Sequence, residues 1–506
     1  MEWKLLFHFS AFMLFQSADF VIFFFFSVLV FRFLPGKFRR NWLLLCSLFF
    51  YLGFDVRFLL VLAPVIGIGF LSGLWMEHAK KTSARKRCFV GSVVLLVLIL
   101  VVFKYTGFLL ENVNALLTAL GQKPIASGLS LILPIGISFY LFQTIGYLAD
   151  VFHGKISAER SFPDYALFIS FFPQITAGPI ARADRLLPQI RRLPEAEKPS
   201  YLHISSGFSL MLWGFFMKMV ISDRAGIFVD NIWQNLFTCG TVETVIAALA
   251  FSLQIYADFA GYSAIAIGAA RILGLELDAN FRTPYFAESI AGFWRRWHIS
   301  LSTWLRDYIY IPLGGSRCSR IRKYRNVMIT FLVSGIWHGA SWSFVIWGGL
   351  HGLYQILGDL LKPLRRKLCI RTGIRENTFS FRLGRILWTF LLTSFAWIFF
   401  RAGSLSNAIY FLNRMFTRWD PWVLFNEDIY AFGLVHLEFN ILTLGTLLLL
   451  AFDLISARKK RDFGELLSAQ SLWLRWLVCL FLILSVLLLG EYGIDFSSGQ
   501  FIYAGF

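Results

Sequence analysis

Residues 293–308 read FWRRWHISLSTWLRDY, and they place three arginines, a histidine and an aspartate inside a chain that is otherwise apolar. Forty residues after His298, the segment SGIWHGA at 334–340 puts a second histidine, His338, within an apolar stretch. Ionisable side chains at membrane depth are costly, so they mark functional sites by default. The two segments therefore predict proton chemistry carried out within a membrane.

The composition predicts a single polytopic membrane domain built of α-helices. Of the 506 residues, 57% are hydrophobic and only 15% are charged. Apolar runs long enough to cross a bilayer recur from end to end, so we expect about 11–13 membrane helices. The candidate spans lie near residues 19–34, 42–54, 57–75, 89–103, 131–150, 204–221, 242–269, 327–342, 344–360, 384–400, 438–456 and 472–490.

Two further apolar stretches, near 164–179 and 293–311, are interrupted by Pro, Gly or charged residues. Such segments survive at membrane depth only when they pack within protein or line a cavity, so we expect re-entrant or in-plane segments. No small-residue cleavage site follows the first apolar run, which predicts a retained span, with Met1–Phe12 as an extra segment and Met13 as an alternative start. Polar residues concentrate between 134 and 350 without an internal repeat, which argues against a carrier built from two matching halves.

The net charge of +18 would suggest nucleic acid as a partner of a soluble protein. No nucleic-acid-binding motif supports that interpretation, and cytoplasmic loops rich in Lys and Arg explain the charge more simply. Basic clusters follow the first and third spans, at 37–40 and 80–87, so both can face the cytoplasm and the N-terminus would lie outside. The six cysteines form no CxxC pair, and we therefore expect neither a disulfide framework nor a bound metal.

His338 is a candidate catalytic base. Gly335 and Gly339 flank it, and small residues there would leave room beside the ring for a substrate or another chain. A neutral imidazole accepts a proton from a hydroxyl near neutral pH, and such a base typically contributes ~10²–10⁴-fold to rate. The alternative is a buried histidine that only hydrogen-bonds a neighbouring helix.

His298 follows two tryptophans and two arginines. In a helix, Trp294 and His298 would share one face, because they are four residues apart. An interfacial amphipathic helix, with arginines reaching to lipid headgroups, would explain the pattern. The number of donors favours a further role, in which Arg295, Arg296 and Arg306 clamp the phosphates of an acyl donor such as coenzyme A.

Asp258 lies mid-span in QIYADFAGYS at 254–263 and needs a partner there. Pairing with an arginine of the central block, to hold the fold, is a simpler explanation than direct catalysis. Gln143 and Tyr147 share one face of the 131–150 span, where they either line the same cavity or join helices, the second being simpler. The other supporting candidates are Trp294, Trp337 and Asp307.

No serine nucleophile elbow, Walker loop, HExxH motif or dinucleotide fingerprint is present in the sequence. Without an obvious nucleophile, direct transfer with histidine as base is the economical mechanism. A covalent histidyl intermediate stays open as an alternative.

In the segments around Asp258, His298 and His338, the chain resembles the membrane-bound O-acyltransferase family, and within it the bacterial branch typified by alginate O-acetyltransferase. The resemblance runs from about Met13 to Arg401. The matching segments are LPIGISFY at 133–140, FP at 172–173 with AGP at 177–179, DFAGYS at 258–263, the block at 293–310 and GIWHGA at 335–340.

The resemblance implies a ring of tilted helices around a central tunnel, with a catalytic core near 130–400 and C-terminal helices at 401–506. It implies that His338 is the catalytic histidine and His298 the second histidine of this branch. Members take acyl groups from a cytoplasmic donor and pass them outward. Some end in a Phe-Ile-Tyr-Phe-like tail tied to acyl hand-over, whereas this chain ends in FIYAGF, so a role for Tyr503 stays open.

The sequence thus predicts an O-acetyltransferase of the bacterial inner membrane, with acetyl-CoA as acyl-donor substrate and no bound cofactor. The expected acceptor is an exported polysaccharide, reached through a periplasmic partner protein. Membrane lipid is an expected partner and nucleic acid is not. Two alternatives stay open, namely D-alanyl transfer from a carrier protein to teichoic acid, and a transporter or flippase without bond chemistry.

Overall fold

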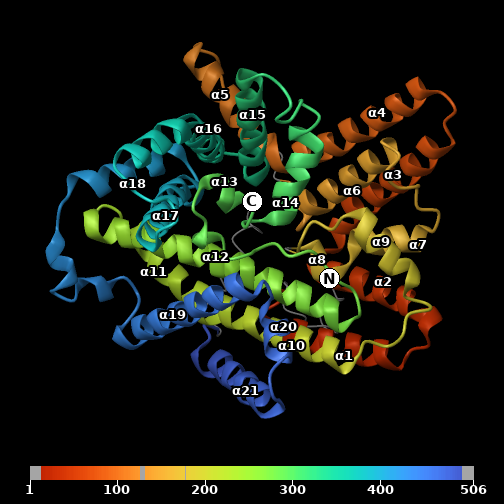
Figure 1. The fold of residues 1–506 in the computed structure, drawn as a ribbon. Helices are drawn as coiled ribbons and strands as arrows, with labels where there is room; N and C mark the ends of the chain where they lie inside the picture. The colour runs from red at the N-terminus through yellow and green to blue at the C-terminus, as the bar shows by residue number, and fades with distance from the viewer. Residues whose placement is uncertain (1–12, 126–130, 177, 493–506) are drawn as a thin grey trace. The chain divides into compact units, whose positions relative to one another are not determined.

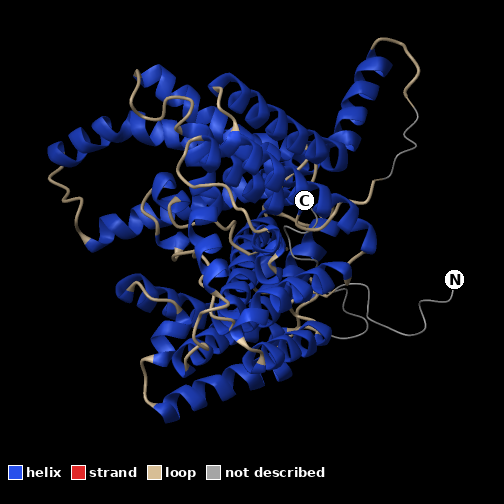
Figure 2. Ribbon diagram, turned by 90° about the vertical axis from the view of Figure 1, so that its right-hand side faces the viewer, coloured by secondary structure: helices blue, strands red, loops and turns tan. Residues whose placement is uncertain are grey.

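Every regular element among the described residues of this computed structural model is a helix (Figures 1 and 2). The structure describes residues 13–125, 131–176 and 178–492. The predicted extra segment Met1–Phe12, the Ala177 of the AGP match and the C-terminal tail with Tyr503 lie outside the described residues. The prediction of an all-helical, polytopic membrane protein is confirmed.

Seven helical segments in the described part of the chain are long and apolar enough to cross a membrane, and all seven coincide with predicted spans. They are Val56–His78, Thr82–Ala119, Tyr201–Gln234, Thr241–Ile272, Phe379–Arg401, His436–Lys459 and Leu472–Leu489. The other five predicted spans fall on helices that are shorter or more polar. These are α1 (Ala18–Phe33), α2 (Gly36–Leu52), α6 (Ile137–Phe152), α15 (Arg320–His338) and α16 (Trp342–Arg371).

The described chain divides into two compact units. Unit 1 holds the chain up to Met211 together with Ile265–Asp278, and unit 2 holds Leu212–Ala264 and the chain from Ala279 onward. Besides α1, α2 and α6, unit 1 contains α3 (Leu59–His78), α4 (Thr82–Leu100), the π-helix η3 (Val101–Tyr105), α5 (Thr106–Ala119), α7 (Phe162–Ser170), α8 (Phe172–Ile175) and α9 (Ala183–Arg192).

Helix α6 forms the core of unit 1, because every residue from Ile137 to Val151 is buried. The helix starts at Ile137 and not at 131 as predicted. Gly136 precedes it with φ of +76°, and a Cβ there would lie 2.1 Å from the Ile175 carbonyl oxygen, so this tight turn sets the start of the helix. Helices α7 and α8 are short and almost wholly buried, in agreement with an interrupted segment at 164–179.

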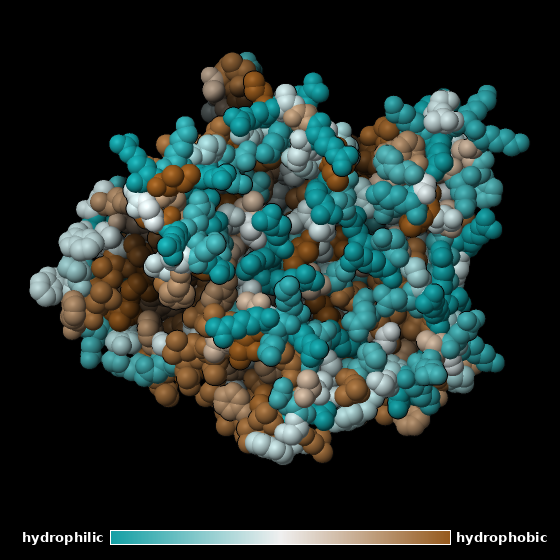
Figure 3. Space-filling view, viewed as in Figure 1, coloured by the Kyte–Doolittle hydropathy of each residue, from teal (hydrophilic) through white to brown (hydrophobic). Residues whose placement is uncertain are grey.

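Helices α10 (Tyr201–Phe215) and α12 (Thr241–Ile272) have residues in both units, and unit 2 contains a tryptophan core. Trp297, Trp347 and Trp397 are buried, and the rings of Trp347 and Trp397 stack at 5.6 Å. On the face seen in Figure 3, apolar side chains gather over α19 (His436–Lys459) and α21 (Leu472–Leu489), as expected of helices that face lipid. The elements of unit 2 include η4 (Phe216–Ser222), α11 (Asp223–Gln234), α13 (Ile290–Trp294), α14 (Ile299–Leu305), α15, α16, α17 (Phe379–Arg401), α18 (Leu405–Thr417), α19, α20 (Phe463–Ser468) and α21.

Candidate active site

The block at 293–308 begins as two short helices separated by a turn. Helix α13 ends at Trp294 and α14 starts at Ile299, so the prediction that Trp294 and His298 share one helical face is wrong. His298 stands in the turn with φ of +43°, the left-handed region. This conformation costs a non-glycine residue roughly 1–2 kcal/mol, and such strain persists where the surrounding structure enforces it.

Asn280 holds the ring of His298. The His298 imidazole is fully buried, and its Nδ1 lies 3.4 Å from the Asn280 Oδ1. The same Oδ1 accepts from the Ser300 hydroxyl at 2.6 Å, and the Asn280 Nδ2 donates to the Ser263 Oγ at 3.0 Å. Because the amide nitrogen is directed at Ser263, its oxygen faces the histidine, which favours the tautomer with the proton on Nδ1. The Nε2 is then the basic nitrogen.

The backbone around His298 is fixed as well. The Ile299 N–H donates to the Asn280 carbonyl at 2.9 Å, and the Arg282 N–H donates to the Arg296 carbonyl, also at 2.9 Å. Two main-chain bonds therefore tie the segment at 280–282 to the residues on both sides of His298. The perpendicular ring of Phe259 packs on the imidazole at 4.6 Å.

His338 ends α15 and is enclosed by aromatic rings. Its side chain is 2% exposed. The Trp347 ring stands perpendicular to the imidazole at 4.8 Å, and Phe400 packs at 5.4 Å. Aromatic walls of this kind exclude water, which strengthens electrostatic interactions inside the site.

The two histidines both pack against one residue, Trp337. The Trp337 ring is centred 4.9 Å from the His338 ring and 6.1 Å from the His298 ring. Residues 40 positions apart are thus brought to one buried aromatic cluster within unit 2. Trp337 is the supporting residue that joins the two.

The glycines beside His338 serve helix packing. A Cβ on Gly335 would lie 2.3 Å from the Phe344 carbonyl oxygen, and one on Gly339 would lie 2.2 Å from the Phe344 ring. The space that the sequence pattern assigned to a substrate or another chain is therefore occupied by α16 of the same chain. Gly348 meets the Phe331 carbonyl oxygen in the same way, at 2.3 Å, so α15 and α16 approach closely.

This contact gives a stability prediction. Gly335→Ala is expected to lower the stability of the purified protein by about 1–3 kcal/mol, because a methyl group cannot enter a packed helix contact without moving the backbone. Gly349→Ala on α16 is the matched control, since its Cβ would meet only the Leu332 side chain at an ordinary 3.8 Å. Thermal unfolding in detergent measures both, and equal midpoints would contradict the packing argument.

A third buried histidine was missed by the sequence analysis. His351 is fully buried on α16, and its Nδ1 accepts a hydrogen bond from the Trp294 indole N–H at 3.2 Å. A signal for it exists, because Gly348, Gly349 and Gly352 surround it much as glycines surround His338. Asn280 carries no comparable signal, and only its contacts reveal it.

Asp258 forms an ion pair with a lysine that the sequence analysis did not consider, and its predicted pairing with an arginine of the central block stays a prediction. The Lys218 Nζ lies 2.8 Å from the Asp258 Oδ1 and 2.7 Å from the Asp223 Oδ1. All three side chains are at most 4% exposed. The prediction that Asp258 needs a charged partner is met within the helices of unit 2.

The arginines proposed as phosphate ligands are spread over the surface of the block. Arg295 and Arg306 are exposed, and Arg306 forms an ion pair with Asp307 at 2.7 Å. The Arg296 guanidinium donates to the Thr283 carbonyl at 3.4 Å. Their predicted role in binding a donor stays a prediction. In the part of the chain that the structure describes, three or more metal-ligating side chains come together nowhere.

Gln143 and Tyr147 belong to unit 1, on buried α6. The Gln143 amide donates to the Phe168 carbonyl, and the Tyr147 hydroxyl accepts from the Glu159 N–H at 2.9 Å. Both side chains join α6 to the segment that follows it. Their part in a substrate cavity stays untested.

Comparison with known proteins finds relatives over most of the chain. Residues 154–400 match the model of the membrane-bound O-acyltransferase family. A probable alginate O-acetylase of Pseudomonas aeruginosa is 36% identical over 447 residues, which cover 87% of this chain and 82% of that protein. A peptidoglycan O-acetyltransferase of Helicobacter pylori is 35% identical over 75% of this chain and 74% of its own length. A teichoic acid D-alanyltransferase of Streptococcus thermophilus is 26% identical over 49% of this chain and 64% of its own.

Proposed function

The chain belongs to the membrane-bound O-acyltransferase family, and from that premise we propose that this O-acyltransferase moves acetyl groups from acetyl-CoA to an exported polysaccharide. Two similar proteins are named for O-acetylation, of alginate and of peptidoglycan, and the chain spans most of the length of each. The teichoic acid D-alanyltransferase is less similar and matches about half of the chain. Acetyl is therefore favoured over D-alanyl as the transferred group.

The observation that carries the proposal is the pair of buried histidines beside Trp337. His338 takes the proton from an acceptor hydroxyl as the oxygen attacks the thioester carbonyl carbon. The C–O bond forms, the C–S bond breaks, and the leaving thiolate of CoA takes up that proton. The reaction therefore needs no external acid or base, and His338 is restored in each turnover.

His298 complements this role. Its Nδ1 is committed to Asn280, so Nε2 can accept a hydrogen bond from a hydroxyl or polarise it. With two bases packed against the same indole, one can orient the acceptor while the other activates it. The buried setting suits a reaction whose intermediates must be kept from water.

The proposal places the donor in the cytoplasm and the polymer outside the inner membrane. CoA is too highly charged to cross a bilayer, so acetyl must pass through the protein while CoA stays behind. Arg295, Arg296 and Arg306 are proposed to bind the phosphates of CoA, and the exposure of Arg295 and Arg306 supports this role.

The basic loops at 37–40 and 80–87 favour a periplasmic N-terminus. A periplasmic partner protein is proposed to carry acetyl to the polysaccharide.

Radiolabelled donors test this function directly. Purified protein with ¹⁴C-acetyl-CoA, the periplasmic partner protein and the polysaccharide acceptor should release CoA and label the acceptor. D-alanyl carrier protein, offered in parallel, should give no transfer. Transfer from the carrier alone would overturn the acetyl assignment, and binding of acetyl-CoA without release of CoA, with the acceptor and partner present, would favour the transporter alternative.

Asn280 provides a prediction about the His298 pair. Asn280→Ala is expected to lower kcat by about 10–100-fold with little change in KM, because a ring misplaced by about 1 Å costs up to about 100-fold. In Asn280→Asp, a carboxylate would accept from the His298 N–H and from both serine hydroxyls. Because a neighbouring carboxylate favours imidazolium, the acid limb of the pH–rate profile should move to higher pH.

Asn326→Ala is the matched control. Asn326 is also buried in unit 2, but its amide donates to the Leu313 carbonyl at 3.1 Å and not to a histidine. Its loss should reduce stability and leave the pH–rate profile in place. An unshifted profile for Asn280→Asp would show that Asn280 has a purely structural role.

A further inference from the structure

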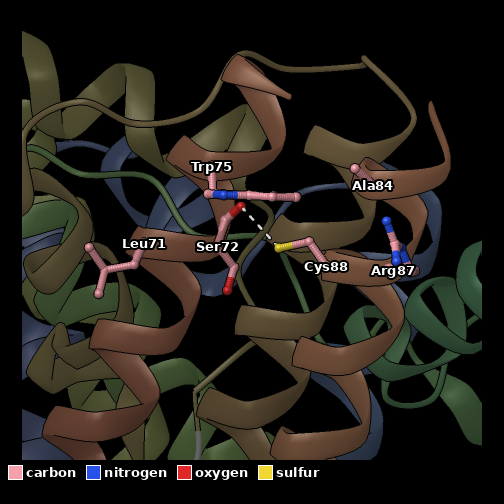
Figure 4. A pocket seen from close by; sticks show the side chains of 6 residues that line it. All are labelled: Leu71, Ser72, Trp75, Ala84, Arg87 and Cys88. Atoms are coloured by element: carbon pink, nitrogen blue, oxygen red, sulfur yellow. Dashed lines mark hydrogen bonds between the residues drawn. The ribbon is translucent and has the colours of Figure 1, made fainter. Parts of the chain in front are cut away.

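Unit 1 contains a groove between α3 and α4 that includes none of the candidate active-site residues (Figure 4). Its volume of about 620 Å³ lies within the about 300–1,000 Å³ typical of ligand pockets. Figure 4 shows Trp75 reaching from α3 toward α4, with Cys88 directed at Ser72. The lining residues are Leu71, Ser72 and Trp75 from α3, and Ala84, Arg87 and Cys88 from α4.

The walls of this groove face the surroundings of the protein. Only 33% of the apolar window of α3 and 11% of that of the segment starting at α4 are buried. Leu71 is 65% exposed and Trp75 is 51% exposed. In a membrane protein, surface of this kind contacts lipid, and a tryptophan near a helix end lies at the headgroup level.

The groove is also positively charged. The adjacent loop and first helical turns carry five basic residues between Lys80 and Arg87. The guanidinium of Arg85 is engaged by the Val151 carbonyl, whereas Arg87 lines the groove and forms no ion pair within the part of the chain that the structure describes. Arg87 can therefore bind an anion that enters from outside.

The start of α4 adds to this charge. Its N-cap, Lys81, makes no side-chain capping bond, and its first turn contains no acidic residue. The first four amides of a helix have no partner within the helix, and the helix dipole makes this end positive. Ala84, in the first turn, lines the groove, so these amides and Arg87 lie along the same stretch of α4.

We propose that the α3–α4 groove binds the headgroup of an anionic glycerophospholipid. The phosphate accepts hydrogen bonds from Arg87 and from the first turn of α4, as anions do at helix N-termini. The indole of Trp75 lies beside the headgroup, and one acyl chain follows the exposed side of α3 past Leu71. A soluble phosphate would make the polar contacts alone, whereas the apolar wall favours a lipid.

Cys88 reports occupancy of the groove, because it is a free thiol among the lining residues. The full-length protein in micelles is treated with N-ethylmaleimide, and the modified peptides are quantified by mass spectrometry. Added dioleoylphosphatidylglycerol should slow alkylation of Cys88 several-fold. Dioleoylphosphatidylcholine and free glycerol phosphate should not, and Cys318, in the loop before α15, should react equally throughout.

A pair of variants isolates the contribution of Arg87. Arg87→Gln is expected to raise the phosphatidylglycerol concentration for half-protection about fivefold, as expected for one basic contact with an anionic lipid. Lys86→Gln removes the same charge from the same turn but does not line the groove, so its effect should be much smaller. If Cys88 does not react in micelles, native mass spectrometry of retained lipid makes the same comparison.

Three results would overturn the proposal. They are equal protection by the zwitterionic lipid, equal effects of the two variants, and protection by glycerol phosphate as strong as that by lipid, which would mark a soluble-phosphate site. None of them depends on acyl transfer, so they leave the proposed function untouched.

Discussion

Replacing His338 with alanine is expected to abolish acyl transfer while leaving a folded protein. A general base typically supplies about 10²–10⁴-fold in rate, and the donor and acceptor can still bind without it. The substitution removes a buried ring that packs against Trp347 and Phe400, so the cavity that it leaves should also lower the midpoint of thermal unfolding. Release of CoA from acetyl-CoA by the purified protein with its acceptor and partner present, wild type against variant, measures the effect.

The control for this experiment is His436→Ala. His436 lies in the same unit with a side chain that is 61% exposed, so its loss should change neither rate nor stability. His338→Gln adds a variant that keeps polarity and approximate size without a proton-accepting ring. Substantial activity in either His338 variant would remove His338 from the mechanism.

Lys218→Met is expected to have the largest effect on stability. It would leave Asp223 and Asp258 buried without the ammonium group that bridges them, and breaking a buried ion pair in this way costs about 3–5 kcal/mol. The predicted result is a large loss of monodisperse protein when detergent extracts are analysed by size exclusion. Where protein can still be purified, its midpoint of thermal unfolding should be strongly lowered.

Two further comparisons test whether the uncompensated buried charge causes this loss of stability. Changing both aspartates to asparagine in the Lys218→Met background should recover most of the loss, because no uncompensated charge is then buried. Lys323→Met removes a partly exposed ion pair with Asp359 and should cost at most about 1 kcal/mol. A Lys218 variant as stable as the Lys323 variant would show that the buried network contributes little.

The fold class was predictable from the sequence because apolar runs and basic loops are composition signals that do not depend on distant contacts. His298 and His338 were found in the same way, since histidine is conspicuous in an apolar stretch. His351 carries a similar signal between Gly348 and Gly352, and the sequence analysis passed over it.

The errors concern contacts between segments. The Lys218 partner of Asp258 was not anticipated, because it comes from the apolar run FMKMVIS of another helix. The glycines beside His338 were assigned to a substrate, although glycine patterns cannot distinguish a ligand from a neighbouring helix. Asn280 acts through a contact across 18 residues, which no local pattern encodes.

The main-chain bonds on both sides of His298 have a consequence for the cost of each turnover. A histidine on an ordinary loop would have to be brought into its reactive orientation in every catalytic cycle, at the expense of conformational entropy. Here the Ile299 and Arg296 bonds fix the turn when the protein folds. The conformational entropy of the turn is then lost once, when the protein folds, rather than in every reaction cycle. The left-handed backbone of His298 is the strain that accompanies this fixed orientation.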